Sequence, residues 1–261
     1  MKRIPMVVVV FFFAAVVSAQ QVVNEAVIQM KIETTPGNDA PPANAPEGAM
    51  VMRFGEGEIK SKLWFKNGMS KIESDMGMGT SQVIYDSKTK TTTTLFEAMG
   101  RKMGFYMTDS AMQKMMSSAD TGRQRMQPFN PEVMIEYLSD SKQVAGMTCY
   151  KANIRYKNRR GEEQQQLVWY TPDFIMGDGF RFNDLMRMAM IPGLQKLKGF
   201  PVEFESKRPN GSSVHYQVTK VDLNPKIDDK VFLIPKDYDV KPMSEMSQGG
   251  GRGQMMFRIG N

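Results

Sequence analysis

The sequence predicts a mainly β protein with a few short helices, an α+β chain in which strands predominate. Most of the chain consists of short segments in which apolar and polar residues alternate, and turn residues separate these segments. This period of two is typical of half-buried antiparallel strands. Residues 184–198 differ, because their apolar side chains cover almost every side of a helix until Pro192 interrupts it. We therefore expect a sheet that wraps around this apolar segment.

The alternating segments give the predicted strands, and Asn67-Gly68 is the clearest hairpin signal between two of them. Strands are expected at residues 26–33, 51–55, 59–66, 69–75, 82–86, 91–96, 102–107, 148–156, 163–170, 201–207 and 214–223. Helices are expected at residues 110–119, 131–138 and 185–197. A proline-rich loop at 35–47 and a disordered, glycine-rich tail at 241–261 complete a single domain that spans residues 20–240.

Residues 1–19 have the composition of a secretory signal peptide. Lys2 and Arg3 form a positive start, residues 6–17 are apolar, and small residues precede the expected cleavage after Ala19. The apolar run is shorter than the roughly 20 residues of a membrane-spanning helix. We expect a periplasmic or exported protein that is soluble after cleavage and has no transmembrane segment in its mature chain. An uncleaved membrane anchor is the alternative.

The charge and the cysteine content restrict the classes of partner. A formal net charge of +6 over 261 residues is mild, and it lacks the concentrated basic surface of nucleic-acid-binding proteins, so no nucleic acid is expected as a partner. Cys149 is the one cysteine of the sequence, which excludes a disulfide within the chain. Its place in an alternating segment favours a buried side chain. An intermolecular disulfide is the alternative.

Two stretches near the C-terminal end carry a resemblance to a known family. Residues 198–202 read Lys-Gly-Phe-Pro-Val, and residues 222–238 follow the pattern D-x-N-P…D-x-x-F-x-x-P-x-x-Y. In these residues the chain resembles the LolA-like periplasmic lipoprotein-carrier superfamily, most closely its exported families of unknown function. The resemblance covers residues 22–238. It implies a curved, incomplete antiparallel β-barrel covered by short helices, and a protein that holds acyl chains or another hydrophobic partner.

No arrangement of residues in the sequence points to catalysis. His215 is the only histidine, and it stands in an alternating segment, where solvent exposure or pairing with a neighbour is the usual state. The sequence contains no G-x-S-x-G motif, and the paired carboxylates Glu162-Glu163 and Asp228-Asp229 fall in expected turns. We expect a protein that is not an enzyme and has no catalytic residue, no cofactor and no metal site.

Methionine is unusually frequent, with 25 residues in the chain. Flexible, polarizable methionine side chains suit a groove that accepts variable apolar partners. Aromatic side chains on the neighbouring strands would extend such a groove. The residues expected to bind the ligand are Trp64, Phe105, Met112, Met115, Met116, Trp169, Met186 and Met190.

Together with the resemblance, these observations predict a non-enzymatic periplasmic binding protein for a lipid, a lipidated protein or another apolar ligand. Its partners would be this apolar ligand or acylated protein, with an envelope protein as a further partner. One alternative is a structural or interaction protein of the cell envelope whose barrel is filled by its own side chains. The other is a Cu(I)-binding protein that uses clustered thioethers, such as those of Met186, Met188 and Met190.

Overall fold

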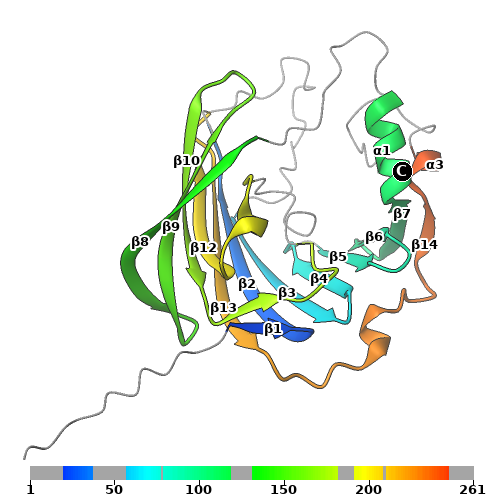
Figure 1. Cartoon of the computed structure of the whole chain (residues 1–261). Coiled ribbons are helices and arrows are strands. Elements are labelled where there is room, and N and C mark those ends of the chain that lie inside the picture. Colours follow the sequence, from blue (N-terminus) through cyan, green and yellow to red (C-terminus); the bar gives the residue numbers. More distant parts are fainter. Residues whose placement is uncertain are drawn as a thin grey trace, which may run out of the picture.

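The structure is a computed structural model that describes residues 20–37, 57–77, 79–118, 131–181, 191–207 and 210–246. The fold is mainly β, as predicted, and within the described residues twelve strands form one curved sheet that does not close into a barrel (Figure 1). In chain order these strands are β2 (Glu25–Thr35), β3 (Gly57–Lys66), β4 (Met69–Asp75), β5 (Gly79–Asp86), β6 (Thr91–Ala98), β7 (Arg101–Thr108), β8 (Val133–Val144), β9 (Met147–Lys157), β10 (Glu163–Thr171), β12 (Phe200–Lys207), β13 (Ser213–Asp222) and β14 (Asp239–Pro242).

The order of the strands in the sheet is β14-β7-β6-β5-β4-β3-β2-β13-β12-β10-β9-β8. Neighbours in this sheet are antiparallel, except that β14 runs parallel to β7. A separate pair of parallel strands, β1 (Gln21–Val23) and β11 (Phe174–Met176), lies at one end of the sheet (Figure 1). The described helices are α1 (Asp109–Ser118), α3 (Met243–Met246) and the 3₁₀ helices η1 (Leu194–Lys196) and η2 (Asp229–Phe232).

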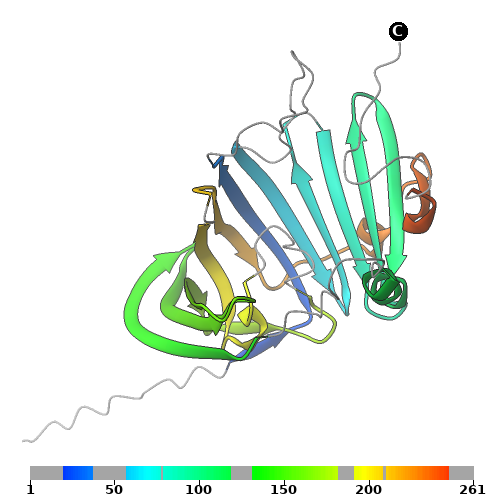
Figure 2. The ribbon, with the colours of Figure 1, turned by 90° about the horizontal axis from the view of Figure 1, so that it is seen from above.

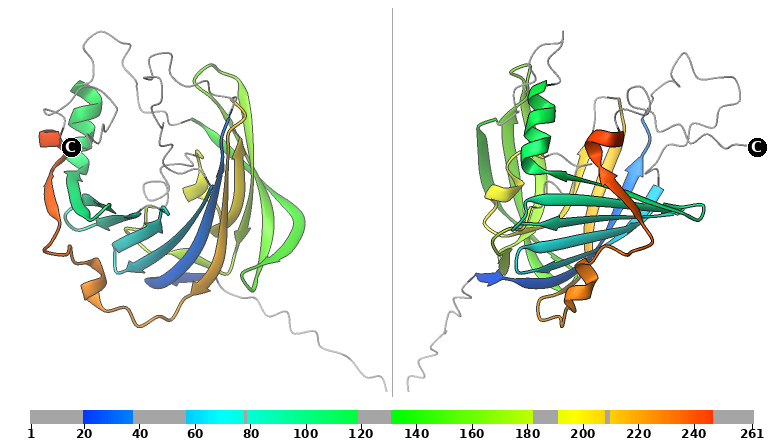
Figure 3. Two further views of the ribbon diagram at one scale, coloured as in Figure 1. Left: turned by 180° about the vertical axis from the view of Figure 1, so that it is seen from behind. Right: turned by 90° about the vertical axis from the view of Figure 1, so that its right-hand side faces the viewer.

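The sheet is bent into a trough, and its open shape is visible in Figures 1 and 2 and in the left view of Figure 3. Strands β5, β6 and β7 form one wall, and β12, β10, β9 and β8 form the other. The helix η1 lies on the concave side, while α1 stands at the end of β7 (Figures 1 and 3). The sheet therefore has a concave face, which lines the trough, and a convex face on its outside.

Two-residue turns join several of the antiparallel strands. Asn67 and Gly68 both have positive φ, 48° and 83°, which is the geometry of the type I′ hairpin that the sequence predicts. Met99-Gly100 and Ala145-Gly146 form similar turns, with φ of 52° and 73° and of 50° and 80°. In each turn glycine occupies the second left-handed position, where it carries no steric cost.

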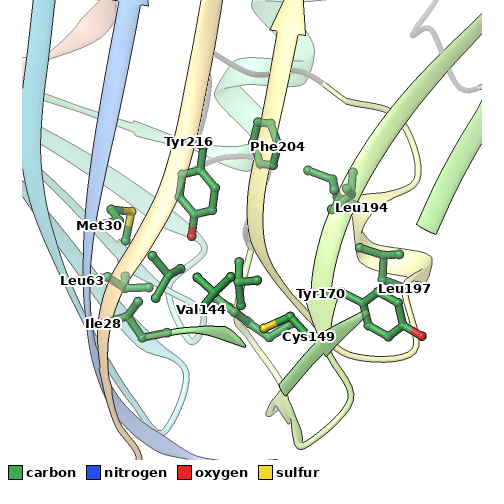
Figure 4. Packing of buried hydrophobic residues seen from close by; sticks show 14 of the residues in the cluster. Ile28, Met30, Leu63, Val144, Cys149, Tyr170, Leu194, Leu197, Phe204 and Tyr216 are labelled. Atoms are coloured by element: carbon green, nitrogen blue, oxygen red, sulfur yellow. The ribbon is translucent and has the colours of Figure 1, made fainter. Parts of the chain in front are cut away.

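The larger buried cluster fills the concave side of the trough between the strands from β3 across β2 and β13 to β9. Alternate residues of these strands point into it, such as Ile28 and Met30 of β2. Leu194 and Leu197, at η1, pack on these strand side chains from the concave side (Figure 4). A row of aromatic rings connects β3 to β11 and to the start of β12. Its neighbouring pairs are Phe65–Phe180, Phe180–Phe200 and Phe200–Phe174, with centroid distances of 5.3, 6.2 and 5.1 Å.

A smaller cluster lies on the convex face, under residues 225–238, which we call the C-terminal strap. The strap leaves β13, passes outside the sheet and leads into β14 (Figure 1). Tyr238 packs with Ile84 and Leu95, and its hydroxyl donates to Glu97 at 3.3 Å. Lys102 binds Asp237 at 2.8 Å. The strap thus brings β14 to the edge of β7.

Residues 131–138 are expected as a helix, but residues 133–138 instead form the first half of β8. The prediction was wrong because Pro131 was read as a first-turn proline, whereas Val133 and Ile135 are β-branched and alternate with exposed residues. Both pack against the larger cluster. An alternating burial pattern therefore outweighed a local helix signal.

Other expectations can be compared only in part with the described residues. Of the expected apolar helix at 185–197, residues 185–190 lie outside them, and the described residues 191–197 form a turn followed by η1 rather than an α-helix. Residues 241–246, the start of the expected disordered tail, belong instead to the end of β14 and to α3. The expected signal peptide, most of the proline-rich loop and the strand at 51–55 lie outside the described residues. Among those residues, no helix is long and apolar enough to cross a membrane.

Because the rings of the aromatic row pack on one another, we expect the removal of one ring to lower the free energy of unfolding strongly. Phe174 is fully buried and stacks on Phe200, so Phe174→Ala should lower the free energy of unfolding by about 3–5 kcal/mol. Urea titration measures this change. Leu233→Ala is the control, because Leu233 is 65% exposed and should change the value by less than about 0.5 kcal/mol. Equal stability of Phe174→Ala and wild type would contradict this role of the row.

Candidate functional site

The concave side of β5, β6 and β7, which we call the inner wall, carries large apolar side chains outside the buried core. Hydrogen-bond register places Phe105 opposite Thr94, and Phe96 opposite Met103. Phe96, Met103, Phe105 and Met107 are half-buried, and none of them belongs to either buried cluster of the described residues. Val83 borders them and also packs against the larger cluster. The inner wall is therefore the part of the concave face that retains accessible apolar surface.

Aromatic and thioether groups are interleaved on this wall. The rings of Phe96 and Phe105 lie 6.2 Å apart, centroid to centroid, at an angle of 34°. Met103 and Met107 alternate with Phe105 along the same side of β7. Such a surface accommodates apolar partners of differing shape, because methionine adapts its rotamers to the partner. Its chemistry fits an alkyl or acyl chain.

A charged group closes one end of the inner wall. Arg181 donates from Nη1 to Asp109 Oδ2 at 2.7 Å and to the Tyr85 hydroxyl at 3.1 Å. Its guanidinium lies 4.9 Å from the centre of the Tyr85 ring. Asp109 is the first residue of α1, whose start is capped by Thr108, since the Thr108 hydroxyl accepts from the Ala111 N–H at 3.2 Å. Arg181 thus joins the segment after β11 to both α1 and β5.

The structure separates the residues that the sequence groups into one site. Phe105 lies on the inner wall, and Met112 is half-buried on α1. Met115 and Met116 belong to α1, but their side chains are outside the described part, as are Met186 and Met190 entirely. Met188, named with Met186 and Met190 as a candidate copper ligand, also lies outside the described residues.

Trp64 and Trp169 do not face the concave side, which corrects their assignment to the same groove. Leu63 and Phe65 point into the core, so strand alternation turns Trp64 to the convex face. Lysine ammonium groups lie over both indoles. Lys62 and Lys71 are 4.7 and 5.5 Å from the Trp64 ring, and Lys142 and Lys151 are 4.4 and 4.9 Å from the Trp169 ring.

A sequence signal for the orientation of Trp64 was available. Lys60, Lys62 and Lys66 share its alternate positions in the strand, which marks that face as polar. Phe96, Met103 and Met107 were missed because aromatic and methionine residues are equally common in ordinary cores. Arg181 was missed because its partners are 72 and 96 residues away in the chain.

His215 belongs to an ion-pair network on the convex face. Its Nδ1 is 3.4 Å from Glu33 Oε2, and its Nε2 is 3.7 Å from Glu203 Oε1. A hydrogen bond from Lys31 lowers the pKa of Glu33. Burial alone would raise the pKa of Glu203, but hydrogen bonds from Lys142 and Gln217 outweigh burial and lower it. These neighbours hold both carboxylates ionised, as in a structural network.

Cys149 and the metal-binding residue types form no further site within the described chain. Cys149 is fully buried, and this burial raises the pKa of its thiol to about 11. In the same described ranges, no three His, Cys, Asp or Glu side chains come close enough to hold a metal ion.

Comparisons with known proteins identify a family but no function. Residues 47–238 match the model of a domain of unknown function, DUF4412. No curated protein matches the chain significantly. Among solved structures, PNGF-II in its C2 crystal form has a TM-score of 0.39 and 11% identity, covering 86% of this chain and 32% of PNGF-II. The present chain thus spans about a third of that protein's length.

A second solved structure is a putative outer membrane lipoprotein-sorting protein domain from Vibrio parahaemolyticus. It has a TM-score of 0.20 and 9% identity, and the match covers 80% of this chain and 89% of that domain. Both likenesses are too distant to transfer a site or a function.

The burial of Cys149 predicts an unreactive thiol. Only the thiolate attacks alkylating reagents, so the native protein should resist iodoacetamide at about pH 8, while the urea-unfolded protein should be modified fully. Intact-mass spectrometry counts the added groups. Equal modification rates in both states, or a disulfide-linked dimer on a non-reducing gel, would contradict the buried position.

Removing the Arg181 side chain should destabilise the junction at α1. Arg181→Ala leaves Asp109 without this partner, and we expect a loss of about 1–3 kcal/mol in the free energy of unfolding, because hydrogen bonds to charged groups are the stronger ones. The control is Arg155→Ala, whose pair with Glu136 has both side chains more than half exposed and should cost about 0–1 kcal/mol. A smaller loss at Arg181 than at Arg155 would contradict the joining role.

Proposed function

Because the chain belongs to the DUF4412 family, a domain of unknown function, we propose a function from its own geometry. The proposal is a non-enzymatic, exported protein that binds an apolar ligand on the inner wall. The ligand class is a lipid or the acyl chain of a lipidated protein.

The observation that carries this proposal is the incomplete burial of Phe96, Met103, Phe105 and Met107 on the concave face. Full burial of a side chain of this size is worth about 1.5–3 kcal/mol. An acyl chain laid along these strands would cover the surface that the chain's own core leaves accessible. Each buried CH₂ group of the ligand would add about 0.8 kcal/mol.

Two sequence features support export and an apolar ligand. Residues 1–19 have the composition of a signal peptide, which would bring the protein to the cell envelope, where acyl chains are abundant. The pattern at residues 222–238 resembles the LolA-like lipoprotein carriers. The non-enzymatic part of the proposal rests on the full burial of the Cys149 thiol and on the contacts of His215 with the carboxylates of Glu33 and Glu203.

A structural role in the cell envelope is the second candidate. It is favoured by the other half of the concave side, which Phe174, Leu194, Leu197 and Phe200 fill from within the chain. In this alternative the barrel would be filled by its own side chains, and the inner wall would take up no ligand. The two candidates differ in whether the purified protein takes up an apolar molecule.

Native mass spectrometry of the protein purified from a bacterial periplasm distinguishes the two candidates. Binding predicts a stoichiometric lipid or acylated adduct, which organic extraction then identifies. A mass without adduct that stays unchanged after incubation with envelope lipids and lipopeptides would instead support the structural role.

Substitutions on β7 test where the ligand lies. Phe105→Ser should weaken the binding of a fluorescent fatty acid at least about tenfold, which equals about 1.4 kcal/mol, because it removes apolar contact on the inner wall. Tyr106→Ser is the matched control, since Tyr106 is the next residue of the strand, points to the opposite face and is 40% exposed. Equal affinity of the Phe105→Ser variant and wild type would place the ligand elsewhere.

A further inference from the structure

A groove lies on the convex face, on the opposite side of the sheet from the inner wall. It has a volume of about 440 Å³ and runs between strands β13, β2 and β3 and the first part of the C-terminal strap. Small-molecule sites in proteins have volumes of about 300–1,000 Å³. This outer groove is therefore large enough for a ligand of the size of a sugar.

The outer groove is held in shape by one lysine beneath the strap. Lys66 donates to the Ile227 carbonyl oxygen at 2.8 Å and binds the carboxylates of Asp229 and Glu25 at 2.8 and 3.4 Å. The hydrogen bond to Asp229 raises the pKa of Lys66. Ile227 is also buried against the sheet. These contacts join the start of the strap to β3 and β2, along one side of the groove.

Lysines outnumber carboxylates in the described lining of the outer groove. Lys62, Lys220 and Lys226 line it, and in the described part of the chain they make no ion pair. Two carboxylates also line the groove, and each accepts one backbone N–H: Asp222 from Asn224 at 3.0 Å and Asp228 from Lys230 at 2.9 Å. The ammonium groups thus remain available to an anion.

An aromatic side chain lies among these cations. Trp64 lines the outer groove, and the Lys62 ammonium is 4.7 Å from its ring centre. A cation–π contact of this kind restrains the ammonium beside the apolar indole. A ligand that combines an anionic group with a compact, partly apolar body satisfies both features. A sugar that carries a phosphate or carboxylate has this combination.

We propose that the outer groove binds an anionic saccharide, with Lys62 and Lys220 contacting the anionic group and Trp64 contacting the sugar ring. This site is independent of the apolar ligand proposed for the inner wall, because the sheet separates the two faces. The anionic group is a phosphate or a carboxylate, and the experiment distinguishes these two sources.

The natural tryptophan of the outer groove serves as the reporter. The sequence contains only two tryptophans, so Trp169→Phe leaves Trp64 as the single indole. We expect saturable fluorescence changes with glucose 6-phosphate, with glucuronate or with both, and a weaker response to inorganic phosphate. Neutral glucose should give no saturable change. Calorimetric titration of the unmodified protein with the same probes checks that Trp169→Phe has not altered the site.

Lysine substitutions test the assignment of the residues. The double variant Lys62→Gln, Lys220→Gln should weaken binding of the anionic sugar at least about tenfold, since charge-assisted contacts are the stronger ones. Lys60→Gln is the matched control, because Lys60 lies on the same strand with its side chain 80% exposed. Unfolding curves of the variants should coincide with that of the wild type, as none of the three lysines is buried.

Three results would overturn the proposal. One is the absence of any saturable response to both anionic sugars in fluorescence and in calorimetry. Another is unchanged affinity in the double lysine variant. The third is binding of inorganic phosphate as tight as that of glucose 6-phosphate, which would assign the outer groove to a free anion rather than to a saccharide.

Discussion

The row of phenylalanine rings, Phe65, Phe180, Phe200 and Phe174, is the interaction on which the rest of the structure depends. A strongly twisted sheet of twelve strands tends to curl, and the concave face of a curled sheet must be covered from inside. The row ties the segment between β11 and β12 to β3. It fills one half of the trough and leaves the inner wall for other contacts.

The residues behind the family resemblance serve mainly to brace the sheet. Asp222 and Asp228 accept backbone N–H groups in the turns of the strap, while Phe232 and Tyr238 are buried beneath it. A pattern of this kind reports how the chain crosses the convex face rather than which molecule it binds. This explains why the resemblance indicates an architecture more directly than a ligand.

Strand alternation allowed most of the sheet to be predicted, because each side chain's face is a local property of the sequence. Asn67-Gly68 likewise identified its hairpin from two residues. The candidate site was predicted less well. Of the residues that the sequence groups together, Phe105 lies on the inner wall, but Trp64 and Trp169 lie on the convex face, and Arg181 depends on partners that only the folded topology brings near. The local sequence determines which side chains of a strand share a face of the sheet. The bend that makes one of these faces concave depends on packing between distant segments.

The pairing of β14 with β7 has a consequence for how the chain is made. The Lys102–Asp237 contact beside this pair spans 135 residues, so a growing chain completes β7 long before its outer partner exists. Until then β7 presents unpaired backbone groups, which can recruit a strand from another molecule. Proteolytic loss of the residues after Tyr238 would restore this state permanently. The last short strand thus covers residues 103–106 of β7 only after the chain is complete.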